Sequence, residues 1–87
     1  MYTIPYAENA IHIGNNYHLN SNILNDISDY IIDTPTTYFL GIDEYDICQI
    51  KTKSKRDSYI VYKILLNSLK KDCIWIIHKG EVIKDEI

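Results

Sequence analysis

The sequence has few of the features that define secreted or membrane proteins. Its two cysteines stand alone and do not form the closely spaced framework of a disulfide-rich secreted domain. No apolar stretch approaches the roughly 20 residues that a membrane-spanning helix needs, and the first residues lack the basic leader and apolar core of a signal peptide. We therefore expect an intracellular, cytoplasmic protein that folds in solution.

The sequence also lacks the paired ligands that hold a metal ion. His12 and His18 are six positions apart, each cysteine lies in its own apolar stretch, and no pattern has the short spacing that is typical of a zinc site. Cys48 and Cys73 are expected to be small buried side chains, which can form a disulfide only if their strands are neighbours. We expect no metal and no cofactor.

Positive charge is absent from the first fifty residues. They hold seven acidic residues and no Lys or Arg, whereas residues 51–87 hold nine basic and five acidic residues. The formal net charge of −3 hides this division. Such an asymmetry indicates either a charged partner or two halves that face each other, and it does not specify a fold.

The length and composition predict one folded domain over residues 1–87. A chain of this size buries roughly 60–65% of the surface that its unfolded form exposes, which is enough for one modest core. With 46% hydrophobic and 24% charged residues, it does not resemble a disordered segment. Ile, Asn, Lys and Tyr make up 40 of the 87 residues, and all have AT-rich codons. This composition favours an AT-rich source, such as a bacterium, a phage or a large virus.

The strongest pattern in the chain is a helix that follows Ser54. Val61, Leu65 and Leu69 repeat every four residues within a wide apolar arc, so this helix must be covered over more than half of its circumference. Ser54 and Asp57 form a Ser-x-x-acidic capping pattern at its start, and two lysines near its end suit the negative end of the helix dipole. We expect it to be the central helix.

A strand and a hairpin are expected directly after this helix. The run Cys73–His78 is apolar, short and rich in β-branched and aromatic residues, which predicts a strand buried on both faces. Lys79 and Gly80 then offer a two-residue turn in which the glycine takes a positive φ. The following segment 81–83 is predicted to return as an edge strand.

The first half of the chain predicts further elements. Alternating apolar residues within 2–6 and 11–13 indicate a short hairpin or two edge segments, and Pro5 favours an edge because it lacks a backbone donor. Isoleucines and leucines at helical spacing predict an amphipathic helix that begins near Asn20 and ends at Thr34 and Pro35. Two strands are expected after this helix, over residues 36–40 and 45–51, and a turn over 41–44 joins them.

This order of elements predicts a small two-layer α+β sandwich. An antiparallel sheet would carry two helices on one face, and the central β-α-β-β-α-β order favours the split βαβ topology of ferredoxin-like domains. Edge strands at the two ends of the chain also allow a homodimer to form by strand pairing.

The acidic residues of the first half are the strongest functional signal. We expect a small, non-enzymatic protein-interaction module that binds a larger protein with a basic surface. One form of this hypothesis is an inhibitor, encoded by a phage or another mobile element, that occupies a nucleic-acid-binding surface. Tyr38 and Tyr45 are candidate anchors, because tyrosine is enriched at interfaces. The candidate acidic residues are Asp26, Asp29, Asp33, Asp43, Glu44 and Asp46.

Two of these carboxylates fall near the end of the predicted first helix. At Asp29 and Asp33 the helix dipole would make a negative charge unfavourable by roughly 0.3–1 kcal/mol each. Carboxylates kept at such positions would matter more for binding than for folding. The alternative is an ordinary solubilising surface, because the penalty is small and is screened by salt.

Two alternative functions use other residues. Nucleic-acid binding would use the basic run 51–56, although the net negative charge argues against a dedicated nucleic-acid binder. A small hydrolase or nuclease would be centred on His78, with Glu81 across the hairpin, but catalysis needs more groups than this pair, which favours a structural contact. The candidate phosphate contacts are Lys51, Lys53, Lys55 and Arg56.

Overall fold

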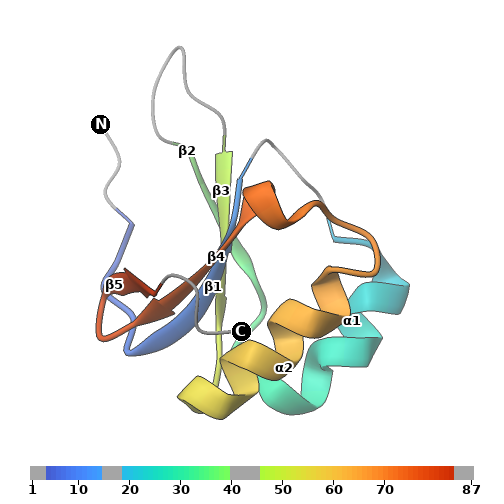
Figure 1. Ribbon diagram of the computed structural model, residues 1–87, viewed down its shortest axis with the longest axis horizontal. Helices are drawn as coiled ribbons and strands as arrows, with labels where there is room; N and C mark the ends of the chain where they lie inside the picture. The colour runs from blue at the N-terminus through green and yellow to red at the C-terminus, as the bar shows by residue number, and fades with distance from the viewer. Residues whose placement is uncertain (1–3, 15–18, 40–45, 84–87) are drawn as a thin grey trace.

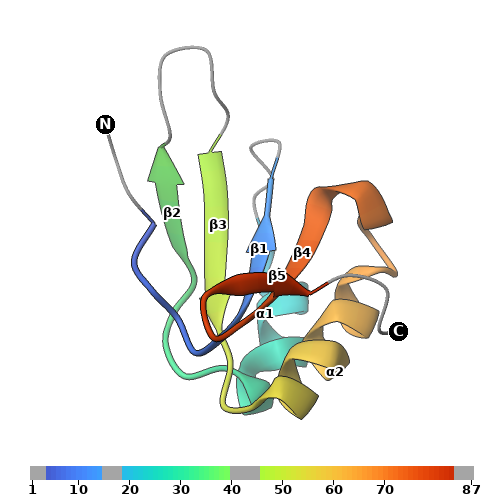
Figure 2. The same ribbon diagram turned by 60° about the vertical axis from the view of Figure 1, so that its left-hand side comes forward.

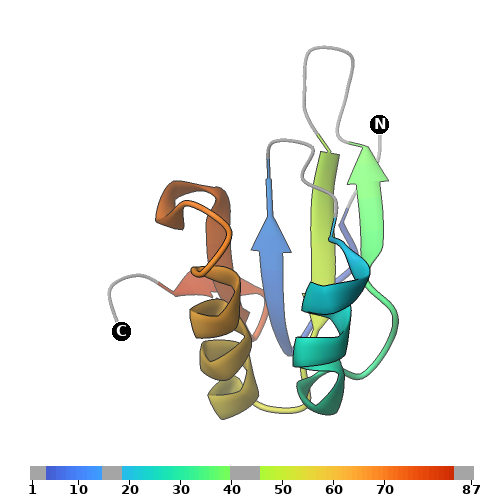
Figure 3. The same cartoon turned by 90° about the vertical axis from the view of Figure 1, so that its right-hand side faces the viewer.

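The computed structural model describes residues 4–14, 19–39 and 46–83. In these ranges five antiparallel strands form one sheet in the order β2-β3-β1-β4-β5, and two α-helices cover one of its faces (Figures 1 and 3). The prediction of a small α+β fold with an antiparallel sheet and two helices is confirmed. The elements are β1 (Asn9–Ile13), α1 (Ser21–Ile27), η1 (Ser28–Tyr30), β2 (Thr36–Phe39), β3 (Asp46–Lys51), α2 (Lys55–Leu65), η2 (Lys71–Cys73), β4 (Ile74–His78) and β5 (Glu81–Ile83).

Strand β1 is central, which corrects the expectation that residues 11–13 form part of an edge hairpin. It pairs with β3 on one side and with β4 on the other, so Ile11 lies between Ile50 and Ile76 and is fully buried. Residues 4–8 form no strand, and they run along the sheet face opposite the helices (Figure 1). Alternation in the sequence predicted a strand at 11–13, but it could not show how many neighbours that strand has.

Helix α2 provides the centre of the core, as predicted. The Ser54 hydroxyl oxygen accepts a hydrogen bond from the backbone N–H of Asp57 at 3.1 Å, which caps the helix. Val61 and Leu65 are fully buried and belong to the main core cluster between the helices and the sheet. The helix ends at Leu65, and its two following lysines, expected in the last turn, lie beyond it.

The hairpin between β4 and β5 also matches its prediction. Ile76 and Ile77 point to opposite faces of the sheet and both are buried, each in a different core cluster. Both turn residues have positive φ, 54° at Lys79 and 77° at Gly80, as a type I′ turn requires. A side chain on Gly80 would also clash, since a Cβ there would lie 2.7 Å from Cε1 of Tyr6.

Helix α1 is shorter than the sequence predicted. It ends at Ile27, a single 3₁₀ turn follows, and Ile31 is already extended and bridges to Thr52. Ile31 fits the helical spacing of apolar residues in the sequence, but in the structure it extends the edge of the sheet and is not part of the helix. The expected placement of Asp29 and Asp33 at a helix C-terminus is therefore wrong. Asp29 lies in the first turn of η1, and Asp33 lies in the bend before β2.

The strand order separates the two cysteines. Cys48 is on β3 and Cys73 ends η2, directly before β4, and β1 lies between these strands. Their strands are not neighbours, and the two residues form no disulfide. Neither helix of the described ranges has the length and apolar character needed to cross a membrane.

Candidate interaction surface

Among the residues that the structure describes, the predicted acidic side chains do not form one patch. Asp26, Asp29 and Asp33 are exposed on α1, on η1 and in the following bend, whereas Asp46 is half-buried at the first residue of β3. Ile32, the neighbour of Asp33, bonds to Lys51 at the other end of β3. The six residues of that strand span roughly 17 Å. The remaining candidates, Asp43, Glu44 and Tyr45, lie outside the described residues.

The basic run lies beside part of the acidic half. The backbone N–H of Ile32 donates to the carbonyl of Lys51 at 2.8 Å, and the N–H of Lys53 donates to the carbonyl of Tyr30 at 3.2 Å. The segment that carries Asp29 and Asp33 therefore runs antiparallel to the start of the basic run. The start of the basic run is therefore joined to the sheet, which weakens the case for an isolated phosphate-binding loop.

Two of the predicted site residues, Tyr38 and Asp46, lie in neighbouring pairs of the β2–β3 ladder, with their side chains on opposite faces of the sheet. Strand β2 forms the edge of the sheet next to β3 (Figure 2), and its register places Tyr38 opposite Ile47 and Phe39 opposite Asp46. Tyr38 is half-buried, while Phe39 is 46% exposed. We name this site the β2 edge, and it consists of Thr36, Thr37, Tyr38, Phe39 and Asp46.

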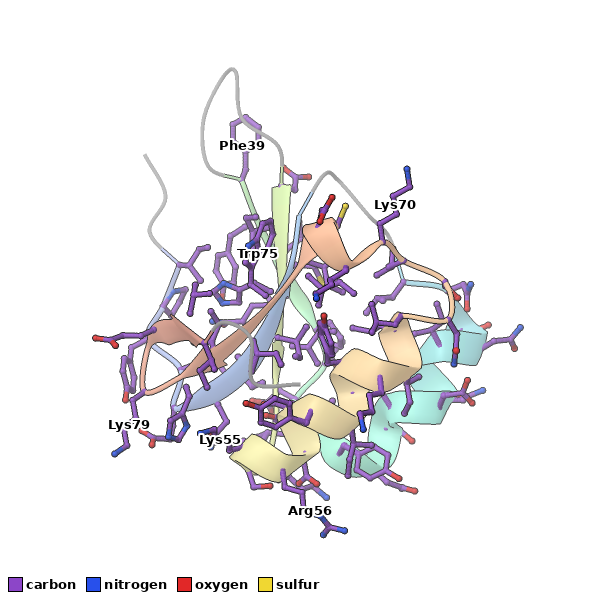
Figure 4. The ribbon with its side chains drawn as sticks, viewed as in Figure 1. Phe39, Lys55, Arg56, Lys70, Trp75 and Lys79 are labelled. Atoms are coloured by element: carbon purple, nitrogen blue, oxygen red, sulfur yellow. The ribbon has the colours of Figure 1, made fainter. Side chains whose placement is uncertain are left out.

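Sequence reasoning did not single out Phe39. The aromatic content of segment 36–40 predicted a strand. Nothing in the sequence indicated which strand would be an edge or which side chain would stay exposed. Figure 4 shows Phe39 at the end of the molecule opposite Lys55 and Arg56. The exposed aromatic ring thus lies away from the cations at the start of α2.

The sheet face opposite the helices carries a row of polar and aromatic side chains. The register aligns Thr36, Gln49, His12 and Trp75 across four strands, from β2 to β4. Gln49 is only 2% exposed, and its Nε2 atom donates to the carbonyl of Pro5 at 3.1 Å and lies 3.2 Å from Nε2 of His12. This contact was not predicted from the sequence. The only signal for it is the position of Gln49 between the apolar residues Cys48 and Ile50.

These contacts determine the state of His12. The Pro5 carbonyl can only accept, so the amide nitrogen of Gln49 must face it, and the nearby Nε2 of His12 must then be an acceptor. Burial lowers the pKa of His12, which also favours the neutral ring. His12 is therefore neutral at pH 7, with its proton on Nδ1.

Residues 4–8 form a strap over this face. The backbone N–H of Gly80 donates to the carbonyl of Ala7 at 3.1 Å, and the N–H of Lys79 donates to the carbonyl of Glu8 at 2.6 Å. A cavity of about 490 Å³ lies at the strap. Among the described residues, its lining holds His12 and Tyr6 as titratable groups but no carboxylate, lysine, serine or cysteine. It is lined by Ile4, Pro5, Tyr6, Ala7, His12, Gln49, Ile77 and Gly80.

His78 takes part in a local contact of the hairpin region. Its Nδ1 atom lies 2.9 Å from the Oδ1 atom of Asn9, which can only accept, so Nδ1 carries the proton. Glu81 is its cross-strand neighbour in the register. This contact links β4 to the start of β1.

The described residues contain no group of three or more His, Cys, Asp or Glu side chains that could hold a metal ion. A scan of the chain against protein-family models, a search of curated proteins and a search of solved structures each found no match. No function therefore carries over from a relative.

Proposed function

We propose that this chain is a non-enzymatic protein-interaction module that binds a larger protein through the β2 edge. The observation that carries the proposal is the exposure of Phe39 on an edge strand, beside the half-buried Tyr38. Large aromatic side chains contribute much of the energy of protein interfaces.

Charge favours a basic partner. Residues 1–50 contain no Lys or Arg, and the outer segment of the sheet carries Asp33 before β2 and pairs with Asp46 at its end. A negative surface attracts a positive one over long range, which raises the association rate. A specific form of the proposal is an inhibitor, encoded by a phage or another mobile element, that covers a nucleic-acid-binding surface of its target.

We also infer that the connectivity is that of a ferredoxin-like domain. In the split βαβ arrangement, the two strands joined by the first helix are separated by a third strand. The order β2-β3-β1-β4 supports this inference, because β3 lies between β1 and β2. Nuclear Overhauser contacts from β1 to both β3 and β4 test it.

Capture of the partner tests the proposed function. The chain is immobilised, nuclease-treated lysate of the source cell is passed over it, and the retained protein is identified by mass spectrometry. We expect a protein with a basic surface that is retained after nuclease treatment and released by salt, since screening weakens charge attraction. Binding to a labelled DNA or RNA oligonucleotide is measured in parallel across a salt series.

Two results of these measurements would contradict the proposal. One is steeply salt-dependent binding of the oligonucleotide, which phosphate contacts from the basic run would produce. The other is the retention of an acidic protein that salt does not release. Steeply salt-dependent binding of the oligonucleotide would instead indicate a nucleic-acid-binding protein, with the contacts made by Lys51, Lys53, Lys55 and Arg56.

A further inference from the structure

We propose that the β2 edge binds by strand addition, with an extended, basic segment of the partner pairing beside β2 as a new strand of the sheet. This inference rests on the proposed function and specifies which part of the partner makes contact. In such complexes, main-chain hydrogen bonds give affinity and side chains on alternate positions give specificity.

The backbone of β2 is available for this pairing. Among the described strands β2 pairs only with β3. Alternate residues of an antiparallel strand direct their N–H and C=O groups to the same side, so half of the four residues Thr36–Phe39 direct theirs away from β3. Three of the four are exposed and one is half-buried. An added strand would satisfy these groups with protein partners in place of water.

The four residues of the strand contain none of three features that commonly block an edge. Proline, lysine and bulges are common protections against strand pairing. A proline and a bulge do occur directly before the strand. Ile32 bonds to Lys51 and Thr36 pairs with Gln49, so the residues between Ile32 and Thr36, which include Pro35, outnumber those on β3 and bulge out of the ladder. The accessible edge therefore begins at Thr36.

The side chains of β2 can recognise an added strand on both faces. Tyr38 points to the face opposite the helices, since it pairs with Ile47, whereas Thr37 and Phe39 point to the helix face with Cys48. Phe39 is labelled in Figure 4 at the far end of the sheet, beyond the helix layer. In a partner strand that alternates basic and apolar residues, the apolar side chains lie on one face, where they would meet either the Phe39 ring or the Tyr38 ring.

Charge identifies a basic segment, and not a second copy of this chain, as the occupant. Asp33 precedes β2 and Asp46 lies opposite its last residue. A second copy would offer its own strand Thr36–Phe39, which carries no cation to pair with Asp33. A strand that carries Lys or Arg on alternate positions would instead meet the exposed carboxylate of Asp33 close to the start of β2.

Hydrogen exchange with two matched peptides tests this inference. The probe is a peptide of about eight residues in which Lys and Val alternate, the length of an ordinary strand. The control has the same sequence and charge, with alternate backbone amides N-methylated so that they cannot donate. Affinity is measured by fluorescence anisotropy, and amide exchange of the full chain is followed residue by residue by NMR.

We expect the unmodified peptide to slow exchange at alternate amides of Thr36–Phe39, and the methylated peptide to bind about tenfold more weakly because hydrogen bonds are lost. Equal binding of both peptides without protection of β2, or protection confined to α1, would overturn strand addition but leave the acidic interaction module intact. If neither peptide binds, then a basic segment is not the occupant and the inference is overturned. A dimer in light scattering that protects β2 without peptide would replace it with self-association.

Discussion

The Nε2 atom of Gln49 lies 3.2 Å from the Nε2 atom of His12, and the same Gln49 nitrogen donates to the Pro5 carbonyl. One buried amide therefore connects two neighbouring strands to the strap over the sheet. Protonation of His12 would place a second N–H donor against this nitrogen, so the contact is compatible only with the neutral ring.

Stability should therefore fall as the pH drops. Burial lowers the pKa of His12 in the folded state, so the unfolded chain binds more protons once the pH nears the ordinary value of about 6.5. The stabilisation from the neutral His12 ring is fully present above about pH 6.5. It is lost as the pH falls through the pKa of His12 in the folded state, which is the lower of the two. Urea denaturation at about pH 8, 7, 6 and 5 measures it. A His12→Gln variant with the same pH slope as the wild type would show that another group causes the change.

The Gln49 side chain should stabilise the fold through its two contacts. Gln49→Leu keeps the approximate size of the side chain but leaves the Pro5 carbonyl and the His12 nitrogen without this donor, a cost of roughly 1–3 kcal/mol if they stay buried. We also expect faster proteolysis near the strap. Chemical denaturation and limited proteolysis measure the two effects, and an unchanged free energy of unfolding would show that water replaces the amide.

Two adjacent leucines provide a matched test of the core. Leu65 is fully buried, whereas Leu66 is 37% exposed. Leu65→Ala should lower the free energy of unfolding by about 2–5 kcal/mol, because it leaves a cavity. Leu66→Ala should cost much less, since water already reaches that side chain. Similar losses in both variants would mean that the buried face of α2 has been assigned wrongly.

A side chain at the turn glycine should destabilise the fold. Gly80→Ala would force an L-residue to a φ of 77° and bring its Cβ to 2.7 Å from the Tyr6 ring, so we expect a loss of about 1–2 kcal/mol or more. Tyr6→Ala removes the ring but not the backbone strain. If the double variant recovers none of the loss relative to Tyr6→Ala alone, then the ring contact contributes nothing and the backbone conformation explains the whole effect.

The local signals of the second half predicted its structure well. The spacing of Val61 and Leu65, the Ser54 cap and the Lys79–Gly80 turn each act over a few residues, so they specify α2 and the hairpin without knowledge of the rest. The central place of β1 and the early end of α1 depend on pairing between distant segments. A single sequence does not reveal such pairing when the apolar pattern fits both outcomes.

The candidate surface likewise depends on pairing between distant segments of the chain. Composition identified an acidic half, but the fold separates Asp46 from the exposed carboxylates of α1 and η1, and it brings the start of the basic run next to Asp29 and Asp33. The exposure of Phe39 depends on its strand being an edge. It could be found only once the strand order was known.

The exposed carboxylates should affect the rate of association more than folding. Asp29→Asn with Asp33→Asn removes two charges from the segment before β2 and should change the free energy of unfolding by less than about 0.5 kcal/mol. Association with the captured partner should slow at low salt and lose part of its salt dependence. Stopped-flow or surface plasmon resonance measures the rate. The control is Asp72→Asn with Glu81→Gln, which removes two exposed charges elsewhere, and an equal slowing in the control would assign the effect to net charge alone.

The most direct test of the β2 edge as the binding surface compares two exposed apolar side chains on opposite edges of the sheet. Phe39 on β2 is 46% exposed and Val82 on β5 is 48% exposed. Calorimetric titration with the captured partner should show at least about tenfold weaker binding for Phe39→Ala, the size expected of an aromatic anchor, and unchanged binding for Val82→Ala. Full affinity in Phe39→Ala together with a loss in Val82→Ala would contradict the account and place the interface at β5.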